Sequence, residues 1–109
     1  MAIDFDRMQA VARGFSRRFP EGHDPFRMMT RLLEECGELA EQVNHFEGSG
    51  VKREKHGEPD RTKLGHELCD VLTCVARLID YYHAEDEVES ALEWVYQRLK
   101  NEGFIPDNP

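Results

Sequence analysis

Two pairs of carboxylates constrain this chain more than any other feature, because each pair lies within an apolar helical run. Glu35 and Glu38 are three residues apart, and so are Glu67 and Asp70. Residues at this spacing share one face of a helix, and leucine or valine flanks each pair at helical spacing, so both faces are also apolar. A buried carboxylate without compensation is costly, and neighbouring carboxylates raise one another's pKa. A divalent cation removes both problems, so the pattern predicts a magnesium site.

A solvated, glutamate-rich helix face is the commonest explanation for any single glutamate pair. The second pair argues against it here, because it repeats the spacing on the most apolar helix of the chain. Hard oxygen ligands with no histidine or cysteine among them suit Mg²⁺, or Mn²⁺. Ferritin-like di-iron bundles use a Glu-x-x-His pair, and the sequence contains none, which argues against iron.

Apolar residues recur every three to four positions over four segments, which predicts helices at about 5–18, 25–46, 61–82 and 85–101. Asp24 followed by Pro25 is a strong signal for a helix start, and Asp60 is a second N-cap candidate. Residues 48–59 are polar and lack periodicity, so we expect a mobile loop there. No strand-like alternation occurs. The sequence therefore predicts a single all-α domain, a four-helix bundle.

The net charge of −8 disfavours binding to nucleic-acid polymers, whose affinity comes from lysine and arginine on phosphates. No apolar run approaches the length of a membrane span, and the first residues lack the apolar stretch of a signal peptide. The three cysteines form no C-x-x-C motif and look like buried small hydrophobes in a reducing compartment. We therefore expect a cytoplasmic protein. A chain of 109 residues buries a modest core, so a homo-oligomer would be unsurprising.

The carboxylates also carry a resemblance. Glu-Glu-x-x-Glu at 34–38, then 28 residues, then Glu-x-x-Asp at 67–70 resembles the signature of the all-α nucleoside triphosphate pyrophosphohydrolases, which include the MazG-like and dCTP-pyrophosphatase enzymes and the dimeric dUTPases. The longer run from Glu35 to Glu41 is typical of the first two groups. The resemblance covers roughly residues 19–80. It implies a magnesium-dependent homodimer or homotetramer that hydrolyses a (deoxy)nucleoside triphosphate to the monophosphate and pyrophosphate, with a house-cleaning role in the nucleotide pool.

The resemblance also implies roles for the acidic residues. Glu35, Glu38, Glu67 and Asp70 would hold the magnesium, and Glu34 would orient or deprotonate the attacking water.

Four further residues are candidate substrate contacts. His23, and Phe19 as the upstream aromatic, resemble the residues that contact the nucleotide in the dCTP-pyrophosphatase branch, although that branch has tryptophan where Phe19 stands. Lys63 and Arg77 lie one turn before and two turns after the second acidic pair, where either could touch phosphate. The alternatives are a capping-loop role for His23, and surface or inter-subunit salt bridges for the two cations.

Two other functions remain open from the sequence. Phosphoribosyl-ATP pyrophosphohydrolase resembles this fold and carries a similar glutamate-rich motif. The second alternative is a non-catalytic helical module for dimerisation or regulation. The presence of all five acidic residues of the motif argues against it.

Overall fold

The computed structural model describes residues 3–48 and 51–107, and no strand occurs among them. Five α-helices and one 3-10 turn follow one another: α1 (Phe5–Arg18), η1 (Pro20–Gly22), α2 (Pro25–Glu47), α3 (Val51–His56), α4 (Arg61–Tyr82) and α5 (Glu85–Asn101). The expected all-α class is therefore confirmed. None of these helices is both long and apolar enough to cross a membrane; a cytoplasmic location stays a prediction.

Side-chain caps begin the long helices where the sequence predicts them. Asp24 Oδ1 accepts hydrogen bonds from the backbone amides of Phe26 and Arg27 at 2.8 and 3.1 Å, and Pro25 occupies the first position of α2. Asp60 caps α4 in the same way through the amide of Thr62, at 2.8 Å. These caps satisfy amides that have no partner within the helix, and they fix where the two carboxylate-bearing helices start.

The expected irregular loop over residues 48–59 is wrong for part of its length, because α3 occupies Val51–His56. This helix has six residues and no apolar period, so nothing in its hydrophobic pattern distinguishes it from a loop. Gly48 follows the last residue of α2, as expected. The other two residues predicted to end that helix, at 49–50, lie outside the described part of the chain.

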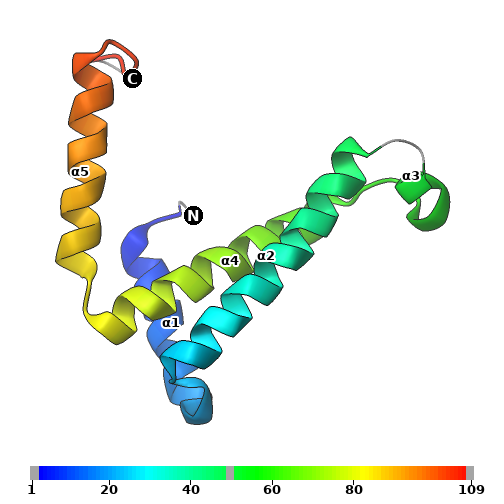
Figure 1. Ribbon diagram of the computed structural model, residues 1–109, viewed down its shortest axis with the longest axis horizontal. Coiled ribbons are helices and arrows are strands. Elements are labelled where there is room, and N and C mark those ends of the chain that lie inside the picture. Colours follow the sequence, from blue (N-terminus) through cyan, green and yellow to red (C-terminus); the bar gives the residue numbers. More distant parts are fainter. Residues whose placement is uncertain (1–2, 49–50, 108–109) are drawn as a thin grey trace.

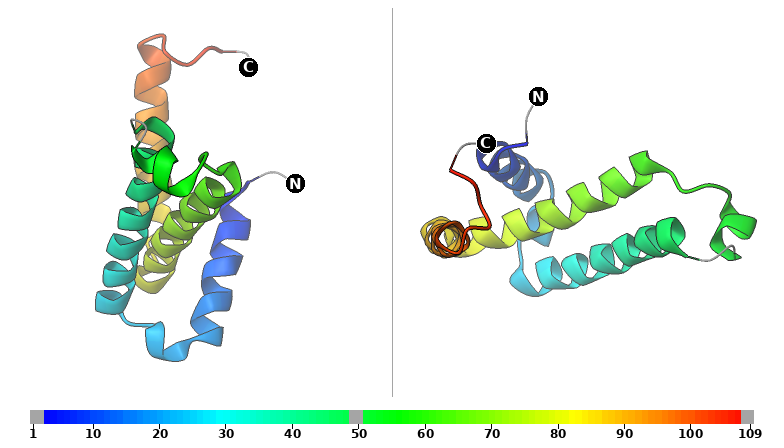
Figure 2. Two further views of the ribbon diagram at one scale, coloured as in Figure 1. Left: turned by 90° about the vertical axis from the view of Figure 1, so that its right-hand side faces the viewer. Right: turned by 90° about the horizontal axis from the view of Figure 1, so that it is seen from above.

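The core lies where α2, α4 and α1 pack together. Figures 1 and 2 show α2 and α4 side by side, with α1 against α4. Few side chains are buried there among the described residues: Gln9, Ala12, Met28, Glu35, Cys74 and Ala76. Two of the six are alanines and one is a glutamate, so the α2–α4 contact encloses an acidic side chain within a small apolar core.

In contrast, α5 packs little against the rest of the chain. Figure 1 shows it leaving the end of α4 and projecting away from the other helices, and none of its residues is buried. The radius of gyration is 17.2 Å, against about 13 Å for a compact domain of 100 residues. Most helical stability in proteins comes from the packing of an apolar face, so the architecture leaves α5 in need of a packing partner.

Removing the α2 cap should destabilise the fold. We expect Asp24→Ala to lower the free energy of unfolding by about 1 kcal/mol, because two amides lose their acceptor. Asp24→Asn keeps an acceptor oxygen and should cost much less. Urea unfolding at one protein concentration, followed by circular dichroism, measures both. Equal losses in the two variants would contradict capping as the cause.

Candidate metal and nucleotide site

Three carboxylates from two helices converge at the α2–α4 contact. Glu35 and Glu38 project from α2 and Glu67 projects from α4, and one carboxylate oxygen of each lies within 4.8 Å of the others. The i, i+3 spacing places the first two on one face of α2, and the packing of α4 along that face adds the third. Three of the four metal ligands predicted from the sequence are therefore together.

Glu35 is the most deeply buried of the three, at 2% exposure. Its Oε1 forms an ion pair with Arg31 Nη2 at 3.0 Å, and the two residues are four apart, about one turn of α2. The other oxygen of Glu35 and Oε2 of Glu67 are buried with no hydrogen-bond partner among the described residues. Leaving such acceptors unsatisfied is costly, so binding a further cationic or donor group would stabilise the cluster.

The electrostatics of the cluster follow from this crowding. Burial raises the pKa of Glu35 to about 7; Arg31 opposes the shift, and the charges of Glu38 and Asp70 add to it. Burial and the charge of Glu38 also raise the pKa of Glu67. Both shifts show that the negative charge is undercompensated, which is the condition in which a carboxylate cluster gains most from a bound cation.

Asp70 lies at the edge of this cluster. It is not among the three that meet within 4.8 Å, but its charge raises the pKa values of Glu35 and Glu67. Its side chain lines a cleft of about 430 Å³ together with that of Glu35. The fourth predicted ligand therefore faces the same space as the cluster.

The cleft combines aromatic and cationic walls. Its lining residues are Phe15, Phe19, Gly22, Arg27, Arg31, Glu35, Asp70, Thr73, Cys74 and Arg77. The two phenylalanine rings stack with their centroids 6.3 Å apart. Two of the arginines are held by backbone carbonyls of η1: Arg27 Nη1 donates to Glu21 at 2.7 Å and Arg77 Nη2 to Gly22 at 3.3 Å. Such a cleft suits a ligand with one flat apolar part and one anionic part.

The predicted substrate contacts divide between the cleft and other places. Phe19 and Arg77 line it. His23 does not: its Nδ1 lies 3.3 Å from Ser16 Oγ, and its ring centroid lies 5.2 Å from that of Tyr81. Lys63 is exposed in the first turn of α4 and does not line the cleft. Substrate roles for His23 and Lys63 stay predictions that the cleft itself does not support.

Glu34, the predicted catalytic base, faces outward. Its side chain is 59% exposed, its Oε2 lies 3.9 Å from Arg31 Nη1, and it lines a shallow groove with Phe26 and Thr30. Adjacent helical residues point about 100° apart, so Glu34 cannot share the face of Glu35. Within one chain, the predicted base and the carboxylate cluster are on neighbouring faces of α2.

Sequence reasoning missed Arg27 and Arg31 as members of the site. Arg31 precedes Glu35 by four residues, the spacing at which opposite charges pair on a helix, and this signal could have identified it. Arg27 adds a second turn to the same face. Their convergence with Arg77 of α4 depends on the packing of α2 and η1 beside α4, which no local spacing encodes.

The residues present fit a magnesium ion. All donors in the cluster are carboxylate oxygens, which Mg²⁺ and Mn²⁺ prefer, and two of the buried oxygens lack a hydrogen-bond partner within residues 3–48 and 51–107. Glu35, Glu38 and Glu67 would hold the ion, with Asp70 beside them.

Comparisons with known proteins show the family to which the chain belongs. A family model described as "MazG nucleotide pyrophosphohydrolase domain" matches residues 23–101, a range that contains all four predicted ligands and confirms the resemblance drawn from the sequence. The chain is 35% identical over 74 residues to the protein YpjD of Bacillus subtilis strain 168, which is described as uncharacterized; the match covers 67% of each chain. No solved structure matches.

Glu35 should make the metal-free protein less stable as the pH rises. Its pKa is raised from 4.5 to about 7 in the folded state. Between these pH values the unfolded chain gives up the proton while the folded chain keeps it, so the free energy of unfolding falls as the pH rises, and above pH 7 a buried charge remains. We expect Glu35→Gln to match the wild type near pH 4.5 and to melt at a higher temperature by pH 8, both in EDTA. Glu93→Gln on α5 is the matched control. A Glu35→Gln advantage that does not grow with pH would contradict this account.

Proposed function

The chain belongs to the MazG nucleotide pyrophosphohydrolase domain family, and from this membership and the site geometry we propose that it is a magnesium-dependent nucleoside triphosphate pyrophosphohydrolase. It converts a (deoxy)nucleoside triphosphate and water to the monophosphate and pyrophosphate, in a house-cleaning role. The observation that supports this most is the convergence of Glu35, Glu38 and Glu67 oxygens within 4.8 Å, with unpartnered buried atoms, beside a cationic cleft.

The cleft suggests how the substrate lies. The triphosphate oxygens would meet the guanidinium groups of Arg27, Arg31 and Arg77, which bind phosphate with paired hydrogen bonds, and the base would stack on Phe19. Bound magnesium supplies a charge that neutralises phosphate oxygens near the carboxylates. Together these contacts hold the α-phosphorus beside the carboxylate cluster, which lowers the entropic cost of reaction.

Hydrolysis then needs a water and a base. The water oxygen forms a bond to the α-phosphorus, the bond from that phosphorus to the bridging oxygen breaks, and pyrophosphate leaves with the bonding electrons. We assign the proton of the attacking water to Glu34. Glu34 faces outward in the single chain, so this assignment follows from the family resemblance and not from the cleft.

We also propose that the protein is a homo-oligomer. An exposed apolar stripe runs along α5 with residues four, three and four apart: Val88, Leu92, Val95 and Leu99. A second stripe on α2 has the same alternation of three and four: Phe26, Met29, Leu33, Cys36, Ala40 and Val43. This is the spacing of helices that pack in coiled-coil fashion. Such large exposed apolar stripes are typical of interaction surfaces.

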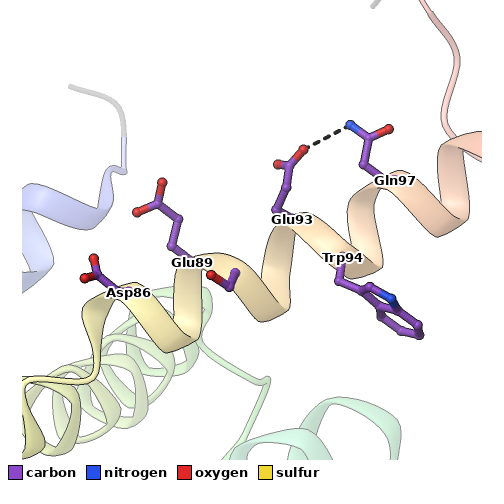
Figure 3. A pocket seen from close by; sticks show the side chains of 6 residues that line it. Asp86, Glu89, Glu93, Trp94 and Gln97 are labelled. Atoms are coloured by element: carbon purple, nitrogen blue, oxygen red, sulfur yellow. Dashed lines mark hydrogen bonds between the residues drawn. The ribbon is translucent and has the colours of Figure 1, made fainter.

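The polar side of α5 supports the same arrangement. Figure 3 shows Glu93 and Gln97 on one side of the helix, joined by a 3.0 Å hydrogen bond, and Trp94 projecting from the other. The surface around them is lined by residues of α5 alone among those that the structure describes, so it is the solvent-facing side of the helix. Acidic residues lead the helix and basic residues end it, which favours antiparallel pairing with a second α5.

Pyrophosphate release tests the reaction. We expect wild-type protein with Mg²⁺ to release pyrophosphate from a nucleoside triphosphate, and Glu38→Ala to lower kcat/KM on the order of 100-fold or more, because charge stabilisation in the transition state is lost. Glu93→Ala on α5 controls for the loss of a glutamate. The panel includes canonical and modified triphosphates and phosphoribosyl-ATP.

The outcomes of this assay separate the alternatives. Pyrophosphate release from phosphoribosyl-ATP alone would identify the protein as the phosphoribosyl-ATP pyrophosphohydrolase of histidine biosynthesis. No release from any compound would favour the non-catalytic helical module and contradict our proposal.

Charging the α5 stripe tests the oligomer. We expect Leu92→Asp to weaken self-association on the order of 100-fold, as for a central apolar interface residue, and to give a smaller particle in analytical ultracentrifugation. Ser90→Asp adds the same charge on the polar side of α5 and should leave association unchanged. A wild-type monomer at all concentrations would contradict the proposal.

A further inference from the structure

Arg31 is an exposed cation that compensates a buried anion. Its side chain is 63% exposed while that of Glu35 is 3% exposed, and Nη2 lies 3.0 Å from Glu35 Oε1. The opposite nitrogen, Nη1, lies 3.9 Å from Glu34 Oε2. The guanidinium group therefore contacts both carboxylates and lies on the solvent side of Glu35.

This compensation is incomplete. Oε2 of Glu35 and Oε2 of Glu67 remain buried without a hydrogen-bond partner in the described part of the chain, although Arg31 is already bound to the first of these side chains. A divalent ion held by the three carboxylates would satisfy these atoms, but it would lie close to the guanidinium group. Two cations on one carboxylate repel each other, and the ion of higher charge keeps the contact. The Arg31–Glu35 pair is therefore the contact that metal binding weakens.

Arg31 also differs from the other two arginines of the cleft. Arg27 and Arg77 donate to the carbonyl oxygens of Glu21 and Gly22, neutral partners that a metal at the carboxylates does not disturb. Arg31 is bound to carboxylates instead. All three side chains line the same cleft, so a guanidinium group released from Glu35 stays beside the other two.

We propose that Arg31 is an exchangeable counter-ion: it neutralises Glu35 in the metal-free protein and, once metal takes that place, binds the phosphate oxygens of the substrate. The proposal rests on the proposed function, since it takes a polyphosphate as the ligand. It makes metal and polyphosphate binding mutually favourable, because each ligand releases the group that the other needs, and such coupling is reciprocal.

Arg31→Gln tests this exchange with readouts other than turnover. Isothermal titration with Mg²⁺ alone should give tighter binding in the variant than in the wild type, because a competing cation is gone. Titration of the magnesium-loaded proteins with inorganic tripolyphosphate should give binding on the order of tenfold weaker in the variant, as expected for a lost charged hydrogen bond. Arg17→Gln, an exposed arginine of α1, is the matched control and should change neither affinity.

Each other outcome overturns the proposal. Weaker Mg²⁺ binding in Arg31→Gln would show that Arg31 positions Glu35 for the ion and does not compete with it. Unchanged tripolyphosphate binding would show that Arg31 makes no contact with phosphate. If the variant does not fold, the wild type decides through the nitrogen resonance of the Arg31 side chain. Mg²⁺ should shift that resonance and tripolyphosphate should shift it again, whereas no shift with either would overturn the exchange.

The same measurements separate this proposal from the proposed function. Opposite changes in the two affinities, without pyrophosphate release from any triphosphate, would keep the exchange and overturn the hydrolysis. Pyrophosphate release with parallel affinity changes would do the reverse. Absence of Mg²⁺ binding to the wild type would overturn both.

Discussion

The burial of Glu35 between α2 and α4 is the constraint on which the rest of the structure depends. A carboxylate at 2% exposure with one oxygen unpartnered is a cost that few small domains carry. Helix starts fixed by Asp24 and Asp60 set the register that brings Glu67 to it. Stability alone does not explain this arrangement, since an apolar residue would pack there without the cost. The position is better explained by a ligand that needs a negative charge.

Much of the fold could be predicted because its signals are local. Asp24–Pro25 and Asp60 mark helix starts by capping chemistry that acts within three residues, and the apolar period identified all four long helices. Where the local signal is absent, as in α3 with its five polar and charged residues after Val51, prediction failed. The way α5 projects could not be predicted either, because its stripe has the same period whether it packs on its own chain or on another.

In the site, too, the features that depend on local spacing could be predicted and those that depend on tertiary packing could not. Helical spacing alone placed Glu35 and Glu38 on one face, and the equivalent spacing on α4 supplied Glu67, so the convergence of these three carboxylates could be predicted. The cleft beside them was found only in part, since Arg27 and Arg77 meet through carbonyls of η1, a turn whose position depends on tertiary packing. The same spacing rule also shows that Glu34, one residue from Glu35, belongs to another face, which motif matching does not reveal.

The small core and the charged site have the same cause, a carboxylate at the main contact between helices. The α2–α4 contact is the main contact between helices, and at its centre a carboxylate takes the place of apolar packing, so this chain gains less from hydrophobic burial than its length allows. Two apolar stripes are meanwhile left on the surface. Any ligand that binds only the folded state adds stability, and under the proposed function a cation at Glu35 and a second chain on α5 would each do so. Metal binding and association would then both be linked to folding, because each would supply free energy that the single metal-free chain lacks.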